Sequence, residues 1–249
     1  MSHRVLDLDL DFFLDEIETW KSSSGSRLPE ADFQAWDEVQ VRAFLEDRCG
    51  LSRDNPIPGC FITHHDEAFV WWRDLIIRGL LKPPFEVVHI DAHSDLGYGD
   101  DSVSYIMGQL LHRPVEERMH PKTGPSGLHA GSYVSFAAAC RWFQKVEYVL
   151  HPKAIDDFVP FHFKDNDPYS GALQLKKCAP ESLRGLTNAI YGPRSFEPEP
   201  DIPFDMVIGA EFKNHLPFTL GLLCHSPGFT PASSDGLIPV IMEYMKPMK

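Results

Sequence analysis

The sequence predicts an α/β fold, a single three-layer α/β/α domain over residues 1–249 with a mainly parallel sheet. Short apolar runs typical of buried strands alternate along the chain with segments of helical spacing. Several of these apolar runs end in Asp, Glu or His, as strands do when a site lies at their carboxyl ends. At 249 residues, 43% of them apolar, the chain is long enough to bury one sizeable core.

Within the first predicted strand, 4–13, residues 6–11 alternate strictly between leucine and aspartate. Side chains two residues apart share a face of a strand, so one face carries the leucines and the other carries Asp7, Asp9 and Asp11. Three aspartates in register repel one another unless cations or hydrogen-bond donors lie opposite them. We interpret them as metal ligands in preference to an edge strand with a solvated acidic face.

A second strand, 87–95, has the same character. Its apolar residues lead into Asp91, His93 and Asp95 at alternate positions, which places the three side chains on one side of an extended backbone. Unpaired charge is costly in a core, whereas carboxylate and imidazole suit Mn, Zn, Fe or Ni. A solvated loop is the alternative. We expect half of a divalent metal site at this strand's end.

The other elements are predicted from periodicity and turn residues. Further strands are expected at 60–63, ending in His64-His65, and at 146–150, 205–210 and 220–224. Helices are expected through most of 14–48, from Trp71 to Leu80, at 106–112, after 136 and at 237–245. Residues 151–204 are expected to be irregular, with one helix at 181–190.

Composition excludes several classes of partner. With 23 basic and 36 acidic residues, the formal charge of −13 argues against nucleic acid or an anionic membrane. The five cysteines are widely spaced, which favours a reducing compartment. No run approaches the roughly 18 apolar residues of a membrane span, and no secretory signal is visible, so we expect a cytoplasmic protein. No feature indicates the oligomeric state.

Taken together, the motifs resemble the ureohydrolases, the arginase and agmatinase superfamily. The family's D-A-H-x-D motif matches residues 91–95 letter for letter, its D-x-D pair matches Asp9 and Asp11, and its first histidine ligand falls on His65 without the usual Gly-Gly-Asp turn. The segment around His129 is similar to the family's L-H-x-x-x-V-S-F. The wording D-L-D-F-F, and S-P-G-F-T-P at 226–231, resembles the branch associated with peptide arginases.

The resemblance implies an arginase/deacetylase-like fold and two Mn²⁺ ions per chain bridged by hydroxide, with Zn²⁺ or Fe²⁺ as possible replacements. Asp91 and Asp9 would bridge the ions, His65 and Asp95 would complete one of them, and His93 and Asp11 the other. The implied substrate is a small guanidine or an arginine-containing peptide, cleaved to ornithine and urea, and His129 would move protons.

The chain departs from the family pattern in two respects. The D-x-D strand follows D-A-H-x-D in arginases but opens this chain, and no motif marks the carboxylate that binds the guanidinium, for which Glu211 is our assignment. The choice between His64 and His65, and the role of Asp7, stay open. The alternatives are a zinc-dependent deacetylase, a haloacid-dehalogenase-type phosphatase and a non-catalytic metal-binding member.

Overall fold

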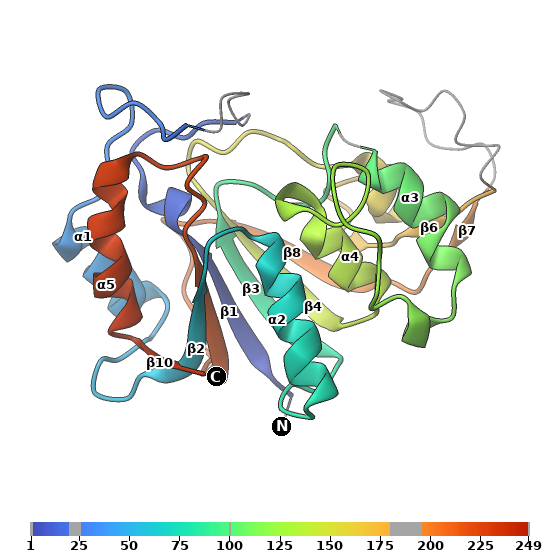
Figure 1. Ribbon diagram of the computed structural model, residues 1–249, viewed down its shortest axis with the longest axis horizontal. Coiled ribbons are helices and arrows are strands. Elements are labelled where there is room, and N and C mark those ends of the chain that lie inside the picture. The colour runs from blue at the N-terminus through green and yellow to red at the C-terminus, as the bar shows by residue number, and fades with distance from the viewer. Residues whose placement is uncertain (1, 20–25, 100, 180–195, 249) are drawn as a thin grey trace.

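The computed structural model describes residues 2–19, 26–99, 101–179 and 196–248, and it has the predicted three-layer α/β architecture (Figure 1). Eight of the described strands form one sheet in the order β10-β2-β9-β1-β3-β4-β8-β5, in which every pairing is parallel except that of β5 with β8. The strands of this sheet are β1 (Arg4–Asp9), β2 (Ile57–Ile62), β3 (Phe85–Asp91), β4 (Phe143–Leu150), β5 (Ala172–Leu173), β8 (Ile202–Ile208), β9 (Leu220–Cys224) and β10 (Met245–Pro247). A separate antiparallel pair consists of β6 (Lys176–Lys177) and β7 (Glu197–Pro198).

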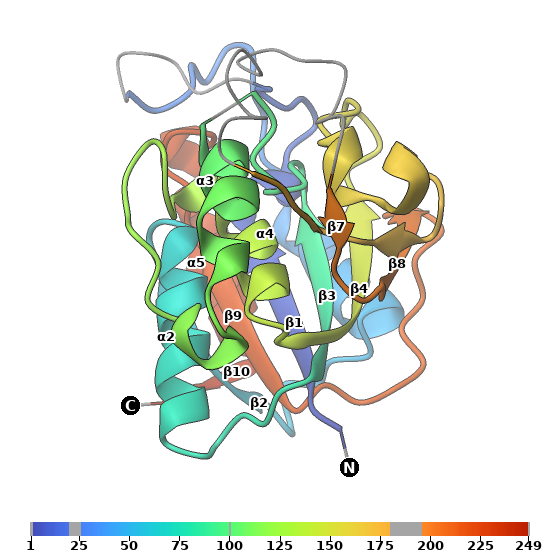
Figure 2. The same cartoon turned by 90° about the vertical axis from the view of Figure 1, so that its right-hand side faces the viewer.

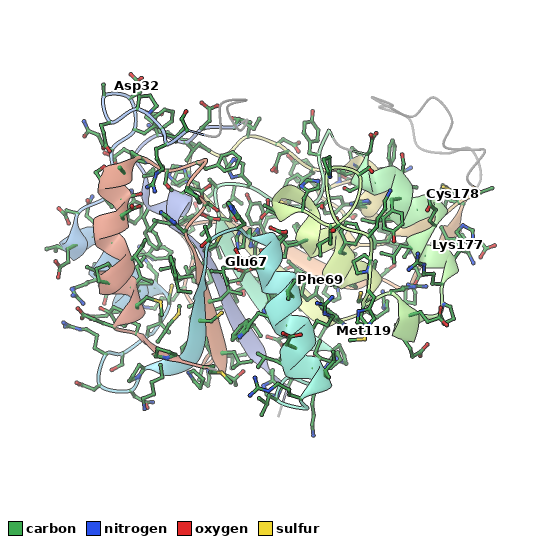
Figure 3. All side chains as sticks on the ribbon, viewed as in Figure 1. Asp32, Glu67, Phe69, Met119, Lys177 and Cys178 are labelled. Carbon is green, nitrogen blue, oxygen red and sulfur yellow. The ribbon has the colours of Figure 1, made fainter. Side chains whose placement is uncertain are left out.

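Helices cover both faces of the large sheet. On one face α1 (Glu38–Ala43) and α5 (Leu237–Met242) lie together, and on the other lie α2 (Asp66–Ile77), α3 (Ser102–Gly108) and α4 (Tyr133–Ala139) (Figures 1 and 2). Each face has its own apolar core. Phe69 of α2, labelled in Figure 3, stacks on Trp142 in one core, with the ring centroids 4.5 Å apart. No helix in the described ranges is long and apolar enough to span a membrane.

The alternation of the first strand determines which side chains enter which core. Leu6 and Leu8 of β1 pack with α1 and α5, whereas Val5 belongs to the core beneath α2 and α4. Asp7 and Asp9 therefore point toward the α2 and α4 face, where they are buried. The strand ends at Asp9, and Asp11 lies in a 3₁₀ turn over Leu10–Phe13.

Two expectations about helices were wrong. Residues 14–19 and 26–36 are irregular, and helical structure begins only at α1 and continues as a π-helical turn over Phe44–Arg48. The apolar spacing there has another cause, because Trp36 packs on Phe12, Phe13 and Phe44 while its backbone N–H donates to the carbonyl of Phe13.

At the carboxyl end, α5 stops at Met242, and Met245 starts the edge strand β10, whose pairing with β2 replaces the last helical turn that the sequence predicts. The helix expected at 181–190 lies outside the described residues. The other predicted strands are present with ends shifted by a few residues, and the helix predicted from Trp71 to Leu80 is α2, which begins earlier, at Asp66.

We predict that Gly209→Ala destabilises the fold. A Cβ atom there would lie 2.5 Å from Cζ of Phe12, a ring enclosed by Phe13, Trp36, Phe44 and His151. Overpacking of this kind should lower the free energy of unfolding in urea by about 1–3 kcal/mol. The control is Gly236→Ala, where φ is −62° and no atom lies within 4 Å, and a change within about 0.5 kcal/mol is expected. Equal effects of the two substitutions would contradict the packing argument.

Candidate metal centre

The carboxyl ends of β1, β2, β3 and β9 meet at the centre of the sheet, above which lies a cavity of about 570 Å³. In the parallel register Asp7 of β1 lies opposite His89 of β3, and Asp9 lies opposite Cys224 of β9. All six predicted metal ligands and His129 line this cavity. The lining residues that the sequence predicts are Asp9, Asp11, His65, Asp91, His93, Asp95 and His129.

One ring nitrogen of His65 faces three carboxylates. Its Nδ1 lies 3.0 Å from Oδ2 of Asp9, 3.0 Å from Oδ2 of Asp91 and 3.1 Å from Oδ2 of Asp95. A ring nitrogen carries at most one hydrogen, so it cannot satisfy three carboxylates. Ligand atoms about 2.1 Å from a metal ion and at right angles to each other are roughly 3.0 Å apart. The distances of these three oxygens from Nδ1 therefore match the spacing of neighbouring ligand atoms around a bound cation.

A second group of ligands adjoins the first. Nδ1 of His93 lies 3.1 Å from Oδ2 of Asp11 and 3.6 Å from Oδ1 of Asp91, whose other oxygen belongs to the His65 group. Neither Oδ2 of Asp11 nor Oδ2 of Asp91 has a hydrogen-bond partner among the residues described, although both atoms are buried. Buried carboxylate oxygens without donors are costly, and a cation between these side chains would remove that cost. Both groups fit a metal ion.

The two histidines are held with Nδ1 free to bind a cation. Nε2 of His93 lies 2.9 Å from the carbonyl oxygen of Glu18, and Nε2 of His65 lies 2.9 Å from Oδ1 of Asp7. A carbonyl or carboxylate oxygen only accepts hydrogen bonds, so Nε2 of each ring carries a hydrogen, and Nδ1 is the nitrogen that would give up its proton to bind a cation. This arrangement, in which an outer acceptor fixes the tautomer, is common to metal-binding histidines.

Asp7, whose role the sequence left open, is the outer partner of His65. The hydroxyl of Tyr133 on α4 donates to its Oδ2 at 2.5 Å, and Nδ1 of His89 lies 3.3 Å from the same oxygen. Burial opposes ionisation of Asp7, but the charges and hydrogen bonds of His65 and His89 outweigh it and lower the pKa of this carboxyl. Asp7 therefore stays ionised and holds the His65 ring in place.

Backbone N–H groups orient the carboxylates. The N–H of Asp11 donates to Oδ1 of Asp9 at 3.0 Å, and the N–H of His93 donates to Oδ1 of Asp91 at 2.7 Å. These short turns use one oxygen of Asp9 and leave its Oδ2 to face His65. Asp95 adopts φ +50°, a left-handed conformation that aspartate tolerates better than most residues. His65 immediately precedes α2, so its backbone is fixed by the start of that helix.

Neighbouring carboxylates raise the pKa of Asp11 and of Asp95. Burial, followed by repulsion from Asp9 and Asp91, holds the pKa of Asp11 well above its usual range. Burial and the charge of Asp91 raise the pKa of Asp95 to about 6. A divalent cation would offset this repulsion and allow all four carboxylates to ionise together.

Of the two predicted catalytic residues, His129 lies at the cavity and Glu211 does not. His129 is half-buried at the cavity, and its Nδ1 accepts a hydrogen bond from the N–H of Gly131 at 3.2 Å. Glu211 is exposed and is not among the described residues that line the cavity. It follows β8, which is separated from β1 by β3 and β4, so the assignment of Glu211 to substrate binding is corrected. His64 is exposed at the cavity, whereas His65 is buried among the carboxylates.

Sequence reasoning missed several residues of the site. The hydroxyl of Ser226 donates to Oδ2 of Asp9, Phe229 lies 4.6 Å from the His93 ring between centroids, and Asp157 lines the cavity from the loop after β4. Cys224 can reach a cation shared with Asp9 and His65. Ser226 and Phe229 belong to the S-P-G-F-T-P run noted above, but no spacing marks Asp157. Comparisons of the chain with protein-family models, curated proteins and solved structures found no match.

We predict that Asp7→Asn weakens metal binding without removing a ligand. The amide keeps the size of the side chain but loses the charge that holds the Nε2–H of His65, and changes to such outer partners cost roughly 10–100-fold in affinity. Competition with a fluorescent chelator would measure this loss for Mn²⁺. The matched control is Asp205→Asn on β8, an exposed aspartate paired with Lys145, which should leave the affinity unchanged. Equal affinities of the two variants would exclude the role assigned to Asp7.

Proposed function

We propose that the protein is a binuclear manganese hydrolase that cleaves the guanidinium group of an arginine within a peptide, releasing urea and leaving ornithine. The observation that carries this proposal is the position of Asp91, which faces His65 with one oxygen and His93 with the other. Two groups of ligands joined by one carboxylate suit a pair of ions. The resemblance of residues 91–95, Asp9 and Asp11 to the ureohydrolase motifs points to the same chemistry.

A single-metal deacetylase accounts for the arrangement less well. Such a site needs one group of ligands and few carboxylates, whereas two overlapping groups gather here and include Asp9, Asp11, Asp91 and Asp95. A non-catalytic metal protein would not require an open cavity beside its metal. Here the cavity adjoins both groups of ligands, and His129 lies in its wall.

In the proposed reaction the protein side chains bind substrate and move protons. A pair of divalent ions would lower the pKa of a water molecule toward neutrality and so supply the nucleophile. Because Nδ1 of His129 accepts a hydrogen bond from Gly131, the neutral ring of His129 carries its proton on Nε2. We assign His129 to proton transfer between the cavity and solvent. Phe229, packed on His93, covers one side of the second ligand group.

The cavity wall favours a peptide over free arginine. Among the described residues that line it, none is Lys or Arg, whereas six are aspartates. Two bound ions would offset the four ligand aspartates, but the α-carboxylate of free arginine would still find no Lys or Arg partner in this described lining and would meet Asp66 and Asp157. An arginine whose carboxyl group is part of a peptide bond avoids this repulsion.

We predict that the Mn²⁺-loaded protein releases urea from a capped peptide with an internal arginine. The value of kcat/KM should exceed that for free arginine by about tenfold or more, because only the free amino acid brings an anion into the acidic cavity. A colorimetric urea assay with amino-acid analysis for ornithine would measure both products. Removal of metal by a chelator, and the Asp91→Asn variant, should each abolish release.

The contrary outcomes are distinct. Absence of urea from peptide, free arginine and agmatine alike, in protein that holds its metal, would rule out guanidinium hydrolysis. Release of acetate from an acetyl-lysine peptide would instead favour the deacetylase.

A further inference from the structure

Asp157 is an acidic residue of the cavity that the ligand groups do not use. It lies in the loop after β4, the strand next to β3, and does not belong to any of the groups of described residues that could hold a metal ion. The backbone N–H of Ser94 donates to its Oδ2 at 2.9 Å, and the hydroxyl of Ser94 donates to its carbonyl oxygen at 3.4 Å. Because Ser94 lies between His93 and Asp95, these bonds fix Asp157 to the loop that carries the ligands.

The other carboxylate oxygen of Asp157, Oδ1, lacks a hydrogen-bond partner in the described part of the chain. This atom is buried. A buried carboxylate oxygen without a donor is destabilising. Asp157 lines the cavity, so a bound molecule can provide the missing donor when the side chain turns Oδ1 toward it.

We propose that Asp157 binds the cationic end of the substrate, accepting a hydrogen bond on Oδ1 from a guanidinium N–H. The inference rests on the proposed function for the identity of the cation. It gives this chain a substrate-binding carboxylate in place of Glu211, which lies outside the cavity. A guanidinium has donors in a fixed plane, and pairing with a carboxylate is its preferred contact.

The remaining carboxylates of the cavity fit this role less well. Four of them, Asp9, Asp11, Asp91 and Asp95, belong to the ligand groups. The sixth, Asp66, is the first residue of α2 and is half-buried. Neither carboxylate oxygen of Asp66 is among the buried atoms without a partner in the described chain.

Tyr148 offers a competing explanation. Its hydroxyl is also buried without a partner among the described residues, and the charge of Asp157 contributes to the raised pKa of Tyr148 after burial itself. A water molecule shared by the two side chains would then donate a hydrogen bond to Oδ1 of Asp157, and this oxygen would not need a donor from the substrate. The two explanations differ in what they predict for ligand charge.

The test compares a cation with its neutral counterpart. The probes are the amides of N-acetyl-arginine and N-acetyl-citrulline, which have nearly the same shape but differ in charge, titrated calorimetrically into Mn²⁺-loaded protein. Every protein compared, the one that is wild type at position 157 included, carries His129→Asn so that turnover of the arginine amide is slow. Wild-type protein should bind the arginine amide about 10–100-fold more tightly than Asp157→Asn does, the usual scale for a charged hydrogen bond. Asp157→Asn should also lose most of the preference for arginine over citrulline, while its manganese content and thermal unfolding midpoint stay unchanged.

Two further variants serve as controls. Asp156→Asn makes the same change one residue away, at an exposed side chain outside the cavity, and should alter the affinity by less than about twofold. Tyr148→Phe removes the partner of the supposed water, and it should leave the arginine preference intact.

An unchanged arginine preference in Asp157→Asn would overturn the inference. The same would follow if Tyr148→Phe and Asp157→Asn reduced the preference equally. Because the affinity and the release of urea are measured in separate experiments, loss of the preference in a protein that releases no urea would sustain Asp157 as the cation site and reject the proposed reaction alone.

Discussion

The concentration of negative charge at the carboxyl end of β1 and β3 is the constraint on which the rest of the site depends. Asp9, Asp11, Asp91 and Asp95 are all buried, and the imidazole nitrogens that lie within 3.1 Å of their carboxylates in the described chain are Nδ1 of His65 and Nδ1 of His93. Such a cluster is unfavourable without positive charge, as the raised pKa of Asp11 shows. The central strands of the sheet therefore carry acidic side chains whose charge a bound cation would offset.

The sheet makes this possible by the position of one strand. β1 opens the chain but lies between β9 and β3, so Asp9 and Asp11 are placed beside Asp91 although some eighty residues separate them in sequence. A strand can enter the centre of a parallel sheet from either end of a chain, provided that its direction and register are kept. The ring of His65 is then held by Asp7, which itself contacts Tyr133 and His89.

The parts of the site that could be predicted are those governed by periodicity. Alternation by two grouped Asp7 with Asp9 on one strand and Asp91 with His93 on another, and the predicted strand before His65 placed that histidine at the same edge of the sheet. Asp157 could not be predicted, because it lies in an irregular loop where only the contacts with Ser94 determine its position. Glu211 was misplaced because a strand end alone does not say where the strand lies in the sheet. The irregular stretch before α1 was misread for a related reason, since aromatic packing around Trp36 imitates helical spacing.

The number of ions that the chain binds tests the account most directly. Metal-free protein would be titrated with Mn²⁺, and the unbound ion followed by its solution electron paramagnetic resonance signal. We expect two ions per chain in the wild type and in Asp205→Asn, and loss of both high-affinity sites in Asp91→Asn, because Asp91 faces both histidines. Binding of a single ion, or two ions that persist without the Asp91 carboxylate, would contradict the shared site from which the proposed chemistry follows.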